Sequence, residues 1–323
     1  MYKISPAVEK HFLKSTPKER VAATIAAIKS SRSVSPDPEL IAMLSGWGSI
    51  KDIIWNQNKY PDLRTEFESL LSEQEMEFAK TGTLWAFHTS FDVIRYMWQM
   101  AKLTGFNGGR IIESGCGAGH FFGAMPKFDD PCELWGVEID PTPAKVCQAL
   151  YPEANIANVD FRDFKCPKGY FDLAIGNVPF GDVKVYDDDV YSNGGLSIHN
   201  YFLAKNLALV RPGGLVMIVT SSFAMDNRDA SFRDWLARGA ELIDITPLTD
   251  TTFKSFDNTE VCADILTFQK LKSPRRCDWL PADCSWTKTV QVTIEDEVVL
   301  VNEAIAKAYN LVEITAIKSA TPH

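Results

Sequence analysis

The stretch Glu113-Ser114-Gly115-Cys116-Gly117-Ala118-Gly119 decides the fold, because it joins a short apolar run at residues 110–113 to a helical segment near residues 120–125. A glycine-rich turn between the first strand and the first helix is typical of a doubly wound α/β domain, where it lets the backbone approach a ligand. The glycines stand at every second position, unlike the G-x-G-x-x-G of dinucleotide-binding proteins, and no Lys-Ser or Lys-Thr follows to form a phosphate-binding loop. A ligand without phosphates therefore fits better, and tight packing of the loop against its helix is the alternative.

Short apolar runs alternate with helical segments after this turn, which predicts a parallel sheet with crossover helices. Strands are expected at residues 110–113, 134–138, 171–176, 214–220, 242–246 and 261–268, with one more ending around residues 158–161. Helices are expected near residues 120–125, 143–150, 198–210 and 230–238. The predicted fold class is therefore α/β, with a doubly wound, mostly parallel sheet of seven strands.

Two further regions flank this α/β domain, which we place at residues 85–270. Residues 1–84 are expected to be helical, and residues 271–323 to form a small α/β appendage. Apolar residues at helical spacing predict helices at residues 17–30, from 36 to about 46, at 70–80 and at 91–103. In the appendage we expect strands at residues 289–294 and 298–301 and a helix from Asn302.

The composition favours a cytoplasmic protein without a membrane span or a metal. No stretch of the 323 residues has the roughly 18 consecutive apolar residues of a membrane helix, and the N-terminus has no basic region followed by an apolar one. Seven cysteines at irregular spacing do not form a disulfide pattern, and Cys277 and Cys284 lack the second pair of a zinc site. We expect reduced thiols.

The net charge of −9 argues against a protein that coats nucleic acid through a wholly basic surface. It leaves room for a local basic cleft. Residues 182–189 are net acidic, whereas Lys270, Lys272, Arg275 and Arg276 form a small basic cluster. Either group could also be an ordinary solvated surface.

Acidic residues at the ends of the next two strands are candidates for contacts with a nucleoside. Glu138, followed by Ile139, stands about 25 positions after the glycine loop, where a carboxylate can accept hydrogen bonds from both hydroxyls of a ribose. Asp160 could accept from an adenine amino group while Phe161 covers the ring. Asp163-Phe164 repeats that pattern and stays open as the alternative pair.

The tetrapeptide Asn177-Val178-Pro179-Phe180 follows the apolar run at residues 171–176. An amide oxygen and a neighbouring carbonyl can accept the two N–H hydrogens of a planar amine, and an aromatic ring can stack on its face. This arrangement suits methylation of an exocyclic amine. Asn-x-Pro is also a common way to end a strand in a turn, which is the alternative.

Taken in order, these motifs resemble the S-adenosylmethionine-dependent amino-methyltransferases, over about residues 85–270. In particular, Gly-Asn-Val-Pro-Phe-Gly with the elements at residues 197–202 and 210–214 is similar to the adenine-N6 modules of phage and plasmid proteins, often fused to helicases. The resemblance implies S-adenosyl-L-methionine as cofactor and Asn177, Val178, Pro179 and Phe180 as the catalytic motif. The cofactor-binding residues that it implies are Phe87, Thr89, Glu113, Ser114, Gly115, Gly117, Glu138, Ile139, Asp160, Phe161 and Asn177.

A pocket for the target base is expected beside Phe180. Phe253 and Phe256 are candidates for its opposite wall, although buried core aromatics are the alternative. His199 could contact the base or the acidic loop, and a structural histidine is the alternative.

The expected function is methyl transfer to the N6 amino group of adenine in double- or single-stranded DNA, with the base flipped out of a duplex. Because only about fifty residues follow Lys270, we expect relaxed or short-site specificity, a contribution from the helical N-terminal region, or a helicase or specificity subunit as partner. Gly46-Trp47-Gly48 in that region is a candidate hinge or docking point, and core packing is the alternative. One alternative is an N-methyltransferase that acts on protein glutamine or RNA. Another is a binding or assembly module without turnover, suggested by Val178 in place of a first proline and by His88.

Overall fold

A computed structural model describes most of the chain: residues 1–56, 58–83, 88–181, 183–226, 231–248, 263–275, 289–294, 297–302 and 313–315. None of the helices in these ranges is long and apolar enough to span a bilayer. In the same ranges, no group of three or more His, Cys, Asp or Glu side chains could hold a metal ion.

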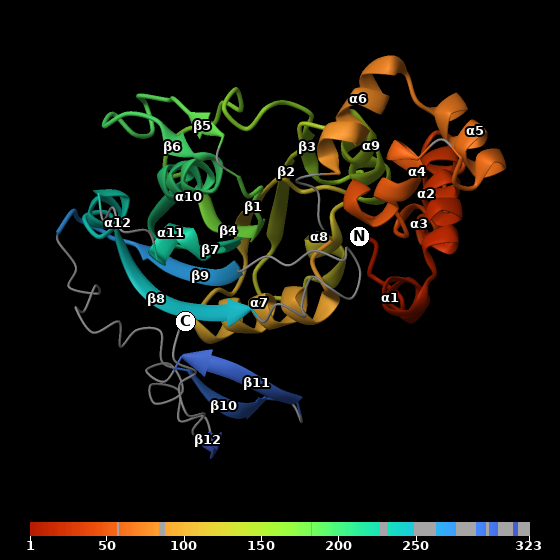
Figure 1. The fold of residues 1–323 in the computed structure, drawn as a ribbon. Helices are drawn as coiled ribbons and strands as arrows, with labels where there is room; N and C mark the ends of the chain where they lie inside the picture. The colour runs from red at the N-terminus through yellow and green to blue at the C-terminus, as the bar shows by residue number, and fades with distance from the viewer. Residues whose placement is uncertain are drawn as a thin grey trace.

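The centre of the molecule is a seven-stranded sheet (Figure 1) with the order β3-β2-β1-β4-β7-β9-β8. The strands in chain order are β1 (Gly109–Ser114), β2 (Cys132–Val137), β3 (Asn155–Ala157), β4 (Phe171–Asn177), β7 (Val210–Ser221), β8 (Ala240–Leu248) and β9 (Ala263–Lys270). All pairs are parallel except those of β9, which runs antiparallel to both β7 and β8. The predicted doubly wound, mostly parallel sheet is confirmed.

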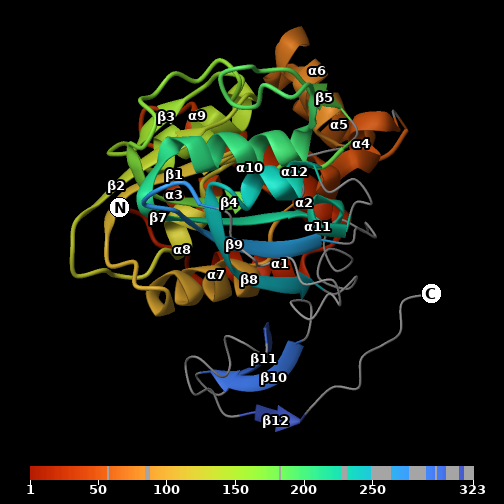
Figure 2. The ribbon, with the colours of Figure 1, turned by 90° about the vertical axis from the view of Figure 1, so that its left-hand side faces the viewer.

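Both faces of the sheet are buried, because successive residues of a strand point to opposite sides. Ile111 belongs to the apolar core under α7 (Phe91–Leu103), α8 (His120–Ala124) and α9 (Pro141–Leu150), whereas Ile112 belongs to the core under α10 (Ile198–Leu209) and α12 (Ser231–Leu236). Figure 2 shows α10 and α12 on one side of the strands and α7 on the other. The bounds of α7 agree with the predicted helix at residues 91–103.

Before α7 the described chain is mostly helical, although the helix predicted from residue 36 to about 46 covers only Pro38–Ile41. The elements are α1 (Pro6–Lys14), α2 (Pro17–Ser31), α3 (Pro38–Ile41), the 3-10 helix η1 (Trp47–Ile50), α4 (Lys51–Trp55), α5 (Pro61–Leu70) and α6 (Glu73–Gly82). The helix predicted at residues 70–80 is wrong in its start. Ser72 accepts from the backbone N–H of Glu75 while the Glu75 carboxylate accepts from that of Ser72, and this capping box begins α6.

The third strand also differs from the prediction, since β3 ends at Ala157 and not around residues 158–161. The Asn158 side chain instead donates to the carbonyls of Glu138 (2.8 Å) and Ile139 (3.0 Å), and the backbone turns at Asp160. Residues 158–161 therefore lie beyond the sheet, at the carboxyl end of the strand.

Smaller elements complete the described chain. They are the two-stranded sheet of β5 (Lys184–Val185) and β6 (Leu196–Ser197), α11 (Phe223–Asp226), and a C-terminal antiparallel sheet of β10 (Thr289–Ile294), β11 (Glu297–Asn302) and β12 (Glu313–Thr315). The strands predicted at residues 289–294 and 298–301 are present. A helix does not begin at Asn302, because β11 includes that residue, and residues 303–312 lie outside the described ranges.

We expect Gly119→Ala to destabilise the domain more than Gly105→Ala. Both glycines have positive φ angles, +80° and +91°, which cost alanine on the order of 1–2 kcal/mol. A Cβ at Gly119 would also lie 2.6 Å from the Tyr151 ring and 2.8 Å from Cys147 Sγ, whereas one at Gly105 would meet nothing within 4 Å. This overpacking should lower the free energy of unfolding of Gly119→Ala by about 1–3 kcal/mol more. Urea unfolding measures the loss of stability in each variant. Equal losses would show that the close approach of Tyr151 to Gly119 adds no cost to the alanine substitution.

Candidate active site

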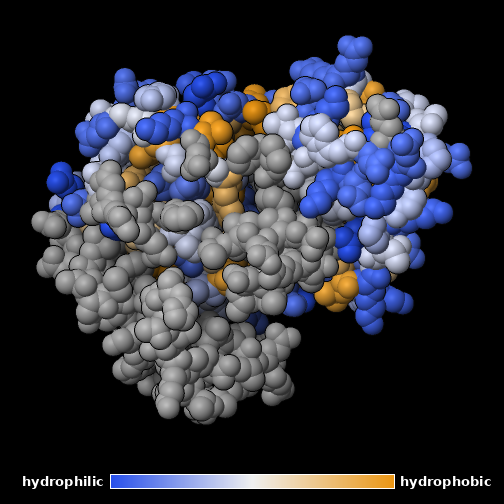
Figure 3. Space-filling view, viewed as in Figure 1, coloured by the Kyte–Doolittle hydropathy of each residue, from blue (hydrophilic) through white to orange (hydrophobic). Residues whose placement is uncertain are grey.

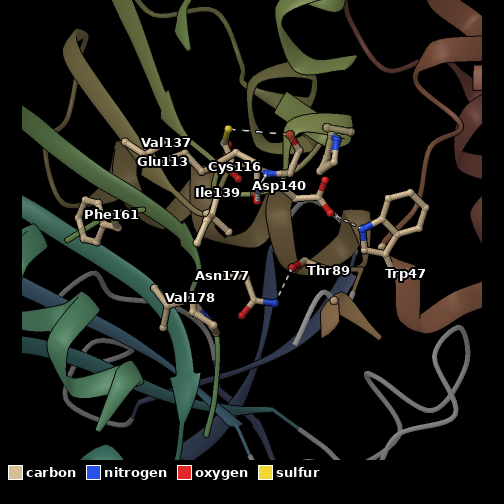
Figure 4. A pocket seen from close by; sticks show the side chains of 18 of the residues that line it. Trp47, Thr89, Glu113, Cys116, Val137, Ile139, Asp140, Phe161, Asn177 and Val178 are labelled. Carbon is tan, nitrogen blue, oxygen red and sulfur yellow. Dashed lines mark hydrogen bonds between the residues drawn. The ribbon is translucent and has the colours of Figure 1, made fainter. Parts of the chain in front are cut away.

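A cavity of about 530 Å³ lies at the carboxyl ends of β1, β2 and β4, where the N-terminal helices face the sheet. Ligands of doubly wound domains bind at this edge. Figure 3 shows apolar side chains gathered between two mostly hydrophilic lobes on this face of the molecule. In Figure 4, Trp47 and Phe161 lie toward opposite ends of the cavity, with Asn177 and Thr89 between them at its lower side.

The glycine loop closes one wall of the cavity. The backbone N–H groups of Gly115 and Cys116 both donate to the carbonyl of Val137, at 2.7 and 3.0 Å, so the loop is held over the end of β2. A Cβ placed on Gly117 would meet no atom within 4 Å, so this position opens onto the cavity. The loop thus leaves room for a ligand beside its backbone.

Glu138 follows β2 and is held by two backbone groups. Its Oε2 accepts from the N–H of Gly117 and its Oε1 from the N–H of Asp140, both at 2.9 Å. Burial raises the pKa of Glu138 to about 7, although these N–H groups favour the carboxylate. Each carboxylate oxygen keeps further lone pairs, so the group can still accept from two hydroxyls.

Asn177 ends β4 on the other side of β1. Its Nδ2 donates to Thr89 Oγ1 at 3.1 Å, which fixes the orientation of the amide. Its Oδ1 is buried and has no hydrogen-bond partner among the described residues. The backbone N–H of Val178 donates to the carbonyl of Val219 at 3.1 Å, which holds the start of the tetrapeptide. A buried amide oxygen without a partner is costly, and a ligand N–H would satisfy it.

Glu113 lies between these two positions, at the end of β1. It is buried, and its Oε2 also has no partner among the described residues. A Cβ on Gly176 would lie 3.1 Å from Glu113 Cγ, so the glycine makes room for this side chain. Burial raises the pKa of Glu113 well above its ordinary value.

The cavity lining suits a cationic ligand without phosphates. Among its described residues are four carboxylic acids, Glu113, Glu138, Asp140 and Asp160, and no lysine or arginine. Burial lowers the pKa values of the two lining histidines, to about 4 for His120 and well below the ordinary value for His88. Both are therefore neutral near pH 7. A sulfonium with an adenosine group fits this set of acceptors, and Glu113, Glu138 and Asp160 are the lining acids that would face it.

Most of the predicted site residues come together here. Those that line the cavity are Thr89, Glu113, Gly115, Gly117, Glu138, Ile139, Asp160, Phe161, Asn177, Val178 and Pro179. Ser114 faces α10 instead, where its Oγ accepts from Asn206 at 2.8 Å. His199 is also away from the lining and pairs with Ser197 Oγ at 3.0 Å. Phe180 is partly buried and packs against both cores.

The two acid–aromatic pairs that the sequence left open differ in the structure. Asp160 and Phe161 line the cavity, whereas Asp163 and Phe164 are not among the lining residues. The turn at residues 160–164 separates them, since the backbone N–H groups of Asp163 and Phe164 both donate to the carbonyl of Asp160. The first pair therefore remains the candidate for the adenine contacts.

Three predicted residues, Phe87, Phe253 and Phe256, lie outside the described ranges. Several lining residues from the N-terminal helices were not predicted from the sequence, namely Leu44, Ser45, Gly46, Trp47, Phe78, Thr81 and Gly82. Gly46-Trp47-Gly48 was expected only as a hinge or docking point, and two of its residues, Gly46 and Trp47, line the cavity.

No family model matches the sequence. It is 26% identical over 213 residues to the "Defense against restriction protein B" of Escherichia phage P1, a match that covers 64% of this chain and 9% of the phage protein. It is 27% identical over 225 residues to the rRNA N6-adenosine-methyltransferase of Caenorhabditis elegans, which covers 66% of this chain and all of that protein. The chain thus spans less than a tenth of the phage relative.

One solved structure aligns with a larger part of the chain. A protein from Listeria monocytogenes, assigned as a class I S-adenosylmethionine-dependent methyltransferase, aligns with 80% of this chain and 91% of its own, at 15% identity and a TM-score of 0.49. The sheet order β3-β2-β1-β4-β7-β9-β8, with β9 antiparallel, is that of a Rossmann-like methyltransferase fold.

We expect the affinity for S-adenosylmethionine to increase with pH up to about 7 and then to level off. The ionised carboxylate can accept from both ribose hydroxyls, whereas the protonated acid carries a hydrogen on one of its oxygens, and the pKa of Glu138 in the free protein is about 7. Below that pH, binding must first remove a proton, which weakens the affinity by up to about tenfold per pH unit. Calorimetry between pH values of about 5.5 and 8.5, on either side of that pKa, measures this profile.

Glu138→Gln is the control, because the amide does not titrate in this range. Above the pKa of Glu138 the variant should bind more weakly than the wild type. It should lose the change in affinity centred near pH 7, while Asp140, whose pKa is about 6, still titrates. The role given to Glu138 fails if the variant keeps the wild-type profile.

Proposed function

We propose that the protein transfers the methyl group of S-adenosylmethionine to the N6 amino group of adenine in DNA. The observation that carries this proposal is the buried Oδ1 of Asn177, which has no partner among the described residues at the end of β4. An acceptor in that position suits an N–H donor that arrives with the substrate. The relation to an rRNA N6-adenosine-methyltransferase and to a phage restriction-defence protein supports adenine in a nucleic acid.

When bound, the cofactor supplies an activated methyl group on a positively charged sulfur. Asn177 Oδ1 and the Val178 carbonyl accept the two N6 hydrogens and hold the nitrogen lone pair toward that carbon. With the cofactor bound, the N6–C bond would form as the C–S bond breaks, and the electron pair of the C–S bond would stay on the sulfur. One N6 proton is then released to water. Positioning supplies much of the rate, and no side-chain base is needed.

Thr89 and Val219 prepare this geometry before the substrate arrives. Because Thr89 takes one amide hydrogen of Asn177, the oxygen of that amide is left for the substrate. Because Val219 anchors the N–H of Val178, the carbonyl of Val178 is carried on a fixed backbone. Phe180 stacks on the target base, which in a duplex is flipped out first.

RNA adenine is the second candidate substrate. The match to the C. elegans rRNA N6-adenosine-methyltransferase extends over that whole protein, whereas the match to the phage protein covers 9% of its length. The same Asn177 geometry serves N6 in either nucleic acid.

We expect Asn177→Ala to lower kcat by roughly 100-fold or more, because the main acceptor for the N6 hydrogens is lost. Cofactor affinity should change little, as Glu138 and the glycine loop are intact. Steady-state methyl transfer and calorimetry measure the two quantities. Asn155→Ala, an exposed asparagine of β3 outside the cavity lining, is the matched control and should keep full activity. An Asn177→Ala variant with wild-type kcat would refute the mechanism.

We expect label from methyl-labelled S-adenosylmethionine to enter DNA and to be recovered as N6-methyladenine after nucleoside digestion. Equal masses of unmethylated DNA, ribosomal RNA and protein extract are offered in parallel, with Asn177→Ala as the background. Label confined to RNA would select the second candidate. Label confined to protein would exclude nucleic acid as the substrate.

A further inference from the structure

We infer that the helical N-terminal region forms the outer wall of the cofactor cavity and that Trp47 is a positioning residue for Glu138. The identity of the cofactor rests on the proposed function, whereas the wall itself rests on the lining residues. Trp47 belongs to no motif of the α/β domain, and its hydrogen-bond partner Asp140 is 93 positions away in the sequence.

Trp47 begins η1 and lines the cavity, although it belongs to the N-terminal helices. The side chain is buried, and its indole Nε1 donates to Asp140 Oδ2 at 2.6 Å. Figure 4 shows this bond at the Trp47 end of the cavity. A buried hydrogen bond to a carboxylate is among the stronger polar contacts in a protein.

Asp140 connects Trp47 to Glu138, because it bonds to both residues. Its Oδ1 accepts from the N–H of Thr142 at 2.9 Å and caps α9, while its own backbone N–H donates to Glu138 Oε1 at 2.9 Å. The indole therefore fixes the side chain of the residue whose backbone holds the ribose acceptor. Trp47 acts on Glu138 through Asp140, not by direct contact.

The indole has little freedom to move. A Cβ on Gly82 would lie 2.3 Å from Trp47 Cδ1, so α6 packs directly on the indole ring. Phe67 of α5 meets the indole edge-on, with 6.1 Å between the ring centroids. This packing joins three N-terminal elements at the cavity wall.

A second polar bridge ties the same region to α9. The buried carboxylate of Glu75 in α6 accepts from Lys145 of α9 at 3.1 Å and from Arg32, which follows α2, at 3.0 Å. The N-terminal helices thus meet the cofactor end of the α/β domain at two places. Since residues 44–47 and 78–82 contribute to the lining, a bound cofactor would contact both parts of the chain.

We expect Trp47→Phe to weaken S-adenosylmethionine binding by roughly tenfold, because the ring remains but the N–H bond to Asp140 is lost. The KM for the cofactor should rise while kcat at saturating cofactor stays near the wild-type value. Asp140→Ala should weaken binding as well, and the double variant should bind no more weakly than Asp140→Ala alone. Additive losses in this cycle would overturn the coupling through Asp140.

Trp135→Phe is the matched control. Trp135 in β2 also donates from its indole Nε1 to a carboxylate, Glu133 Oε1 at 2.8 Å, but this bond is exposed and lies outside the cavity lining. Loss of the Trp135 N–H bond should change cofactor affinity by less than about twofold. Equal weakening in both variants would show that Trp47 acts only through general stability.

Hydrogen exchange of the wild-type protein tests the wall without any substitution. Saturating S-adenosylmethionine should slow exchange at residues 44–50 and 78–83 as well as at the glycine loop. Protection of the loop alone would overturn the inference and leave the proposed function intact. No binding of S-adenosylmethionine to the wild type would instead contradict the proposed function.

Discussion

The carbonyl of Val137 is the point on which the site depends, because it accepts from two consecutive backbone N–H groups, those of Gly115 and Cys116. The parallel register of β1 and β2 pairs Ser114 with Val137 and so brings the loop to this carbonyl. With the loop turned over the end of β2, the N–H of the following glycine meets the carboxylate of Glu138. One backbone acceptor thus fixes both the loop and the acid that follows it.

The strand order then places the two chemical ends of the cavity on either side of that loop. β1 lies between β2 and β4, so Glu138 and Asn177 stand at the ends of the two strands that flank it. A ligand whose hydroxyls meet Glu138 and whose reactive end meets Asn177 must cross the glycine loop. The open space at Gly117 and the acceptor on Glu113 lie along that path. In the proposed reaction, the sheet itself therefore sets the distance between the ribose acceptor on Glu138 and the amine acceptor on Asn177.

Local patterns predicted the strands, the glycine loop and the acids at the strand ends, since each depends on residues close together in the sequence. The start of α6 differs from the prediction although Ser72-x-x-Glu75 is a local signal, because Leu70 and Leu71 continue the apolar spacing of the helix beyond its true start. The end of β3 depends on Asn158, whose amide bonds to carbonyls 19 and 20 positions earlier. The wall made by Trp47 depends on Asp140, 93 positions away. Such contacts leave no periodic trace in the sequence.

The raised pKa values of the cavity acids bear on how cofactor and product would exchange. Burial raises the pKa of Glu138 to about 7 and that of Asp140 to about 6, so ionising both in the free cavity is costly. A cationic ligand reduces that cost because it favours the carboxylates. In the proposed reaction the sulfur loses its positive charge when the methyl group leaves. The acids then lose their counter-charge at the moment of transfer, which favours release of the product and binding of the next cofactor.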